Sequence, residues 1–207
     1  MTHRQRGFLI AALLVAGLAF LPAASRASTI VLNPVDDGSL YTCSGCNPSP
    51  VRSYVLVSGY IVGDIDFQNP MLGGSIENAL LSVNPYALPL FGPQISVYGV
   101  ASTSATISLA DLASLTFLGT WTLPANLTFG QPAYFDVTSF LEGVQSPYVA
   151  FVLETPSAET DVFSSTETNY GLPPQMTITT PEPAALALLG AGLLALLGGA
   201  RRKAFRA

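Results

Sequence analysis

The chain has 207 residues, 13 acidic and 8 basic side chains, one histidine and a formal net charge of −5. Seven of the eight basic residues lie in the two terminal segments, so residues 28–180 hold twelve acids against Arg52 alone and carry a net charge of −11. Such an acidic surface repels phosphate backbones, which argues against nucleic-acid binding, and for the same reason it disfavours docking on anionic lipid.

The first 27 residues have the features of a secretory signal. Two arginines precede an apolar stretch over residues 8–20 that is short for a membrane span, and small residues occupy the −3 and −1 positions before Ser28. We predict a signal peptide at residues 1–27, cleaved after Ala27, with cleavage after Ala24 or an uncut signal anchor as alternatives. The two arginines are not adjacent, so export by the Sec machinery is expected.

Residues 28–180 are enough for one domain, which would bury about 70% of its unfolded surface. Short apolar or alternating runs recur along them, rich in Val, Ile, Tyr, Phe and Thr and separated by Asn-Pro, Gly-Gly, Gly-Pro and Pro-Pro dipeptides. This pattern predicts an all-β domain, a β-sandwich of many short strands. The runs lie at residues 54–62, 76–83, 95–100, 115–123, 133–137, 148–153, 162–165 and 176–179.

Only two short helical turns are expected between these runs. Ser108 and Asp111 form a capping-box pattern that opens the first turn, because each side chain can accept a hydrogen bond from the backbone of the other. Asp136 is expected to cap the second turn, which Gly143 would end.

The cysteines Cys43 and Cys46 form a C-x-x-C motif that admits several interpretations. A c-type haem needs a histidine directly after the motif, where Asn47 stands, and a zinc site needs two further ligands that a mature chain without His or a third Cys does not offer. A thioredoxin-like site needs a helix N-terminus, but Gly, Asn and Pro surround this pair. We predict a short disulfide in an oxidising compartment, with redox chemistry or free thiols as alternatives.

Four aspartates are candidates for ligand or calcium binding. Strand alternation places Asp64 and Asp66 on the face opposite Ile65, so we expect both acids to point outward or to lie at a sheet end. Together with Asp36 and Asp37, they are where calcium could bind through carboxylates and loop carbonyls, although the chain has no EF-hand spacing. No other cofactor is expected.

The residue types in the mature chain argue against catalysis. A Ser-His-Asp triad is excluded because residues 28–180 contain no histidine. Among twelve acids some pair is inevitable, so we expect the pairs Asp64/Asp66 and Glu142/Glu154 to be solvated or capping residues rather than glycosidase carboxylates. The chain is therefore expected not to be an enzyme, and a carbohydrate-active enzyme is the weakest alternative.

Carbohydrate binding depends on exposed aromatic side chains. Trp121 is the only tryptophan, and alternation places it on the same strand face as Leu123, which favours a core position over a sugar-binding platform. It stays a candidate ligand-binding residue with Asp64 and Asp66. The other available aromatics are Tyr41, Tyr60, Tyr86, Tyr98 and Tyr170.

The C-terminal segment, residues 181–207, has three parts. Pro181, Glu182 and Pro183 come first; an uncharged apolar run follows at residues 184–200, and a basic tail at 201–207 begins with Arg201, Arg202 and Lys203. The run would span about 26 Å as a helix, at the lower edge of what a bilayer core needs. We predict a transmembrane helix whose basic tail stays cytoplasmic, so that residues 28–180 face outward.

This ending resembles the PEP-CTERM sorting signal of Gram-negative bacteria. The resemblance implies recognition by an exosortase, a membrane cysteine protease that cuts near the motif, and an association with exopolysaccharide production. It implies transient anchoring in the inner membrane, with the mature domain in the periplasm, on the surface or outside the cell. We expect an envelope or extracellular-matrix protein linked to exopolysaccharide or biofilm, with a module that binds a neutral glycan as the alternative.

The domain itself resembles DNRLRE-type domains, which are jelly-roll β-sandwiches of bacterial surface proteins. The resemblance rests on residues 63–67, 74–81, 135–140, and 163–167 followed by 174–178. It covers residues 54–180 and implies a jelly-roll fold for the ectodomain, residues 28–180. The chain departs from the family pattern at Pro173, where an arginine is usual, and related modules bind acidic polysaccharide through basic residues that this chain lacks.

Overall fold

The structure is a computed structural model that describes residues 27–42, 53–72, 76–87, 94–124, 127–168 and 171–181. The chain divides into two compact units, and the unit treated below is Thr29–Thr180. The other unit, Met1–Ser28 with Pro181–Ala207, falls almost wholly outside the described residues. The predicted signal peptide, the predicted membrane helix and the Cys43–Cys46 motif therefore lie outside them as well.

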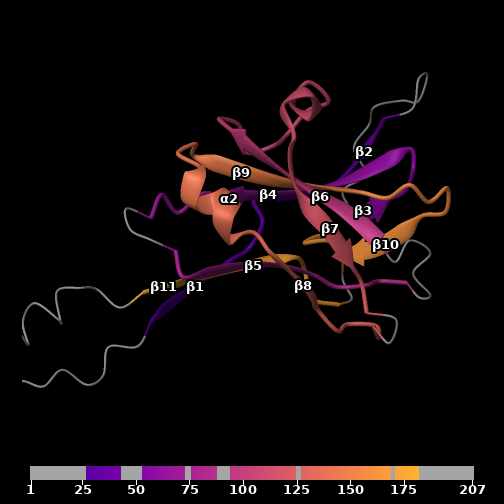
Figure 1. The fold of residues 1–207 in the computed structure, drawn as a ribbon. Coiled ribbons are helices and arrows are strands. Elements are labelled where there is room, and N and C mark those ends of the chain that lie inside the picture. Colours follow the sequence, from indigo (N-terminus) through magenta and orange to yellow (C-terminus); the bar gives the residue numbers. More distant parts are fainter. Residues whose placement is uncertain are drawn as a thin grey trace, which may run out of the picture. The chain divides into compact units, whose positions relative to one another are not determined.

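The domain is built of antiparallel strands in two layers (Figure 1). One layer is a five-stranded sheet with the order β2 (Asp36–Tyr41), β4 (Ile61–Gln68), β9 (Tyr148–Glu154), β6 (Gln94–Ser102) and β7 (Thr116–Thr122). The other is a four-stranded sheet with the order β1 (Ser28–Leu32), β11 (Gln175–Thr180), β5 (Asn78–Val83) and β8 (Ala133–Asp136). A two-stranded pair, β10 (Asp161–Ser164) with β3 (Tyr54–Val57), completes the fold.

One hydrophobic core joins the layers, because strand alternation sends one side-chain set of each sheet inward. Phe67 and Phe151 of the five-stranded sheet and Ile178 of the four-stranded sheet are all fully buried in it. The β3–β10 pair contributes Val55 and Phe163 to the same core. The domain is thus an all-β sandwich, as the alternating pattern predicts.

Successive strands switch repeatedly between the layers. The chain passes from β4 to β5 and back to β6, and later from β7 to β8 and back to β9. Crossovers of this kind are typical of Greek-key sandwiches. As a result, strands far apart in the sequence become neighbours, and the last strand, β11, lies between β1 and β5.

Most predicted runs coincide with strands, but the run at residues 54–62 is not one strand. The backbone N–H of Ser58 donates to the carbonyl of Ile61 at 2.8 Å, and the reverse bond measures 3.3 Å. This tight turn separates β3 from β4, and the chain passes there from the two-stranded pair to the five-stranded sheet. Strands β1 and β2 were not predicted; β1 is a short edge strand, and β2 begins with two aspartates, residues that are depleted in strands.

The two helical turns lie where the capping signals predict them. The Asp111 carboxylate accepts hydrogen bonds from the backbone N–H of Ser108 at 2.7 Å and from its hydroxyl at 2.8 Å; the turn that follows is the 3₁₀ helix η1 (Asp111–Ser114). The Asp136 carboxylate accepts from the backbone N–H of Thr138 at 2.9 Å, at the start of helix α2 (Thr138–Gly143). Among the described residues, no helix has the length and apolar character that a membrane crossing needs.

A second, smaller core covers the outer face of the five-stranded sheet. The connection from β6 to β7 folds back over this face and buries Ile107 against Leu40, Val62 and Val152. A hydrogen bond of 2.8 Å from the Thr106 hydroxyl to the Asp36 carboxylate ties the same connection to β2. Strand alternation alone predicts that the outer face is exposed to solvent, but this connection buries part of it.

Candidate functional site

The last strand of the domain is also the start of the C-terminal segment. In β11, Met176 and Ile178 are fully buried in the core, and Thr179 pairs with Asn78 of β5. The backbone N–H of Glu77 donates to the carbonyl of Thr179 at 2.8 Å. Pro181 is exposed and, because it has no N–H, it cannot extend the strand ladder. The folded domain thus ends within a residue or two of the predicted sorting motif.

The first strand lies beside this last one (Figure 1). The side-chain amide of Gln175, at the start of β11, donates to the side-chain oxygen of Asn33, just after the end of β1, at 3.2 Å. The end of β1 is therefore next to the start of β11, so the two strands run antiparallel and Ser28 lies at the same end of the domain as Thr180. The first residue of β1 and the last residue of β11 thus lie at one end of the sandwich, which we call the sorting junction (Ser28 and Thr180).

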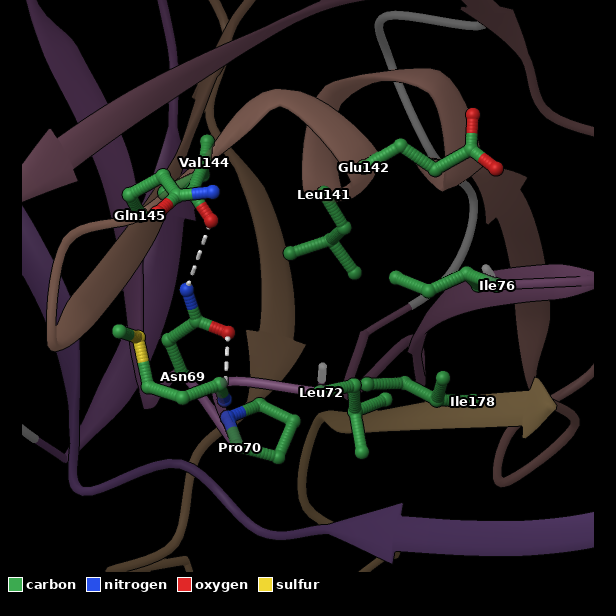
Figure 2. A pocket seen from close by; sticks show the side chains of 10 residues that line it. Asn69, Pro70, Leu72, Ile76, Leu141, Glu142, Val144, Gln145 and Ile178 are labelled. Carbon is green, nitrogen blue, oxygen red and sulfur yellow. Dashed lines mark hydrogen bonds between the residues drawn. The ribbon is translucent and has the colours of Figure 1, made fainter. Parts of the chain in front are cut away.

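A small hollow of about 150 Å³ lies near this junction, between α2 and the connection from β4 to β5 (Figure 2). Most of the residues that line it are apolar, and they include Ile178 of β11. At its rim the Asn69 side-chain N–H donates to the carbonyls of Val144 at 3.3 Å and Ser146 at 2.9 Å, while the Asn69 side-chain oxygen accepts from the N–H of Met71 at 3.2 Å. These bonds hold Met71 at a φ of 49°, an uncommon conformation for a residue with a side chain.

Among the described residues that line the hollow, Glu142 is the only ionisable one, so these residues do not supply the two carboxylates that glycoside hydrolysis uses. Glu154, the other acid of the pair expected to be solvated or capping, is the last residue of β9, whereas the chain enters β9 from the α2 side. The first and last residues of β9 are six positions, about 20 Å, apart, so the fold does not bring Glu142 and Glu154 together.

The predicted outward position of Asp64 and Asp66 is wrong in one respect. Both aspartates are on the face opposite Ile65, as alternation requires, but both are fully buried. Their neighbours on that face include Val62 and Val152, which belong to the second core beneath Ile107. They are therefore not solvated residues, because the β6–β7 connection covers the sheet face on which they stand.

Asp36 and Asp37 are not in a loop but in β2, on opposite faces of the strand. Asp36 lies directly across from Asp66 of β4. Asp37 is 1% exposed; its carboxylate accepts hydrogen bonds from the backbone N–H of Thr166 at 2.9 Å and from the Thr166 hydroxyl at 2.8 Å. Burial raises the pKa of Asp37 above its ordinary value, against the lowering effect of these bonds.

The four aspartates do not form an evident metal site. Within the part of the chain that the structure describes, no three His, Cys, Asp or Glu side chains are grouped so that they could hold a metal ion. Asp37 is turned to Thr166 rather than toward Asp64 or Asp66. Calcium binding at Asp36, Asp37, Asp64 and Asp66 stays a prediction.

Trp121 lies in the core rather than on a surface platform. It is 6% exposed, and its ring packs against Phe135 with the centroids 5.9 Å apart. Of the two interpretations open for Trp121, the structure thus favours the core position, and an exposed sugar platform would need other aromatics. Three other aromatic residues, Tyr54, Tyr86 and Phe129, do lie together in the structure. Of these, only Tyr86 is among the candidate aromatics identified from the sequence. No local pattern links three rings that are tens of residues apart.

Comparison with known proteins identifies the C-terminal segment. The family described as the PEP-CTERM protein-sorting motif matches residues 179–203. The match begins inside β11 and includes Pro181, Glu182, Pro183 and the basic residues Arg201, Arg202 and Lys203. The chain therefore carries a PEP-CTERM sorting motif, which marks an exported protein for processing by an exosortase at the membrane. No curated protein matches the chain.

Proposed function

We propose that this chain is an exported, non-enzymatic protein of the cell envelope or extracellular matrix, linked to exopolysaccharide or biofilm. The observation that carries the proposal is the direct continuation of a buried core strand, β11, into the matched sorting motif. In this proposal the Sec machinery exports the chain and the apolar run at residues 184–200 holds it transiently in the inner membrane. An exosortase then cuts near Pro183.

The position of the junction makes such a cut compatible with an intact domain. The core residues of β11, Met176 and Ile178, precede Pro181. Only residues 181–183, an extended length of about 10 Å, separate β11 from the apolar run. A cut at or beyond Pro183 therefore removes no core side chain and no residue of the strand ladder, so the product would be a folded domain with a very short C-terminal tail.

The non-enzymatic part of the proposal rests on the residues that the domain offers. Residues 28–180 contain no histidine or lysine, and Glu142 is the one ionisable residue among the described lining of the hollow. The layer-switching sandwich is compatible with the jelly roll of DNRLRE-type domains, and we extend the proposal to that fold family. A module for a neutral glycan is the second candidate, supported by the exposed aromatic group considered below.

Intact-mass analysis of the protein from its own cells tests the sorting proposal. The expected mature species begins at Ser28, ends near Pro183 and lacks the basic tail; in cells without exosortase it should keep residues 184–207 and fractionate with the inner membrane. Replacing Pro181, Glu182 and Pro183 together by alanine should give the same retained form. Conversion of Glu159, an exposed acid outside the matched motif, to alanine is the matched control and should leave processing unchanged. A mature wild-type protein that still carries the basic tail would contradict the proposal.

A further inference from the structure

Three aromatic rings from separate parts of the chain meet near the β3–β10 pair. The rings of Tyr54 and Tyr86 lie 4.6 Å apart between centroids, with a tilt of 50° between their planes. The ring of Phe129 meets Tyr86 edge-on at 6.1 Å. Phe129 is 54% exposed, and both tyrosines are partly exposed. We call these three residues the aromatic group.

Strand pairing holds the two tyrosines in place. Tyr54 is in β3, where it pairs with Ser164 of β10, and it points away from the core because its neighbour Val55 is fully buried. The segment with Tyr86 lies along the other edge of β10, where the backbone N–H of Tyr86 donates to the carbonyl of Val162 at 2.9 Å. A hydrogen bond between the two tyrosines raises the pKa of Tyr86, because loss of its proton would remove the bond.

A tight turn holds the phenylalanine. The backbone N–H of Gln131 donates to the carbonyl of Thr128 at 3.0 Å, and the third turn position, Gly130, has a φ of 74°, a conformation that glycine adopts without strain. The residue before the turn, Leu127, is buried in the main core. An exposed phenylalanine is therefore presented on an anchored turn, and each ring of the aromatic group is fixed by its own backbone contacts.

The aromatic group lies at the far end of β5 from the sorting junction. Asn78, which pairs with Thr179, begins β5, and Tyr86 lies eight residues after Asn78, about 26 Å along an extended chain. Figure 1 shows the β3–β10 pair and the β1–β11 pair toward opposite ends of the domain. The aromatic group and the end of β11 therefore lie at opposite ends of the sandwich.

We propose that Tyr54, Tyr86 and Phe129 form a binding site for a neutral polysaccharide, with the rings stacking on the apolar C–H faces of the sugar. The backbones of the three residues are already fixed, so these residues lose little conformational entropy on binding. This low entropic cost favours binding of a repeating ligand whose individual units bind weakly. The tyrosine hydroxyls can hydrogen-bond sugar hydroxyls at the edge of the stacked face. Burial of Trp121 in the core leaves this group as a ring cluster that reaches solvent.

Charge decides the class of polysaccharide. Residues 28–180 carry twelve acids against Arg52 alone, a net charge of −11, so a uronic-acid or sulfated polymer would be repelled rather than held. A neutral chain meets no such penalty. This inference does not depend on processing by an exosortase, because the aromatic group lies wholly within residues 54–129.

Affinity electrophoresis of the full chain in mild detergent tests the site. We expect slower migration in gels that contain dextran, galactomannan or laminarin, which are neutral, and no slowing by alginate, a polyuronate. The variants Phe129→Ala and Tyr86→Ala should weaken the binding by about fivefold to tenfold, whereas Tyr86→Phe, which keeps the ring, should weaken it less. Phe117→Ala is the matched control, since Phe117 is 58% exposed but contacts Tyr98 instead.

Three results would overturn the site. The first is normal migration with all three neutral polymers, and the second is stronger retardation by alginate than by any of them. The third is wild-type binding by both Phe129→Ala and Tyr86→Ala at unchanged melting temperature. Intact mass reads out sorting and gel migration reads out binding, so failure of one proposal is distinguishable from failure of the other.

Discussion

The carbonyl oxygen of Thr179 accepts a hydrogen bond of 2.8 Å from the backbone N–H of Glu77, at the point where the four-stranded sheet ends. This bond joins the last strand, β11, to the start of β5, and the sorting match already begins at residue 179. The domain cannot complete its core until β11 has been exported, because Met176 and Ile178 belong to that core.

Shortening the core side chain of β11 should destabilise the whole domain. Ile178 is fully buried, so Ile178→Ala removes buried methyl groups and leaves a cavity, with an expected loss of about 2–5 kcal/mol in the free energy of unfolding. Chemical denaturation of the full chain in detergent measures this loss. The neighbouring change Thr177→Ala, at a partly exposed position, should alter the free energy of unfolding by much less. Equal losses from both changes would argue against the inward position of Ile178.

Gly99 provides the space in which helix α2 packs on the five-stranded sheet. A Cβ atom at this position would lie 2.6 Å from the Phe140 ring, too close for ordinary contact. Gly99→Ala should therefore lower the free energy of unfolding by about 1–3 kcal/mol. Gly143→Ala is the matched control, because a Cβ there meets nothing within 4 Å and alanine favours a helix, so its melting temperature should stay equal or rise. A neutral Gly99→Ala would mean that α2 packs elsewhere.

Protonation of Asp37 should make the stability of the domain depend on pH. Burial raises its folded-state pKa above the ordinary 3.8, so the protonated form is favoured in the folded state. The resulting stabilisation is present below about pH 4 and is lost as the pH rises through the folded pKa. Asp37→Asn removes this pH-dependent stabilisation. In denaturant unfolding, the free energy of unfolding of the variant relative to the wild type should therefore be higher at pH 7 than at pH 3. A free-energy difference between the two proteins that does not change with pH would contradict the prediction.

Asp136 should behave in the opposite way. Its hydrogen bonds from the Thr138 hydroxyl and backbone N–H lower its pKa below the ordinary 3.8, so the charged form is favoured in the folded state. This stabilisation is present above about pH 4 and is lost as the pH falls through the lowered pKa. In the same unfolding series Asp136→Asn should therefore be more harmful at pH 7 than at pH 2. NMR titration of the carboxyl group checks the direction, and a folded pKa above 3.8 would refute it.

The cysteine motif makes a prediction that needs only the exported protein. Cys43 and Cys46 should be joined in a disulfide, because an oxidising compartment favours the bond and the mature chain offers no further thiol. Alkylation without reductant, followed by mass spectrometry, should leave both cysteines unmodified, and prior reduction should expose both. Alkylation of both cysteines without reductant would support the free-thiol alternative instead.

The sequence alone determined the sorting motif and most of the strands, since each of these features depends on contiguous residues. A short polar motif, an apolar run and a basic tail follow one another directly, and the alternation that predicts β5 or β9 needs only a few neighbouring positions. The hydrogen bonds from Ser108 to Asp111 and from Thr138 to Asp136 depend on equally short spacings, although the N-cap residues of the two turns are Ala110 and Val137.

The tertiary structure alone decided which surfaces are dry and which groups meet. Asp64 and Asp66 stand on the outward face that alternation predicts, yet the β6–β7 connection buries that face from forty residues away in the sequence. Tyr54, Tyr86 and Phe129 meet only because β10 pairs with two segments and a separate turn reaches Tyr86. Alternation is a local property of the strand, whereas solvent access depends on whatever distant segment folds over it.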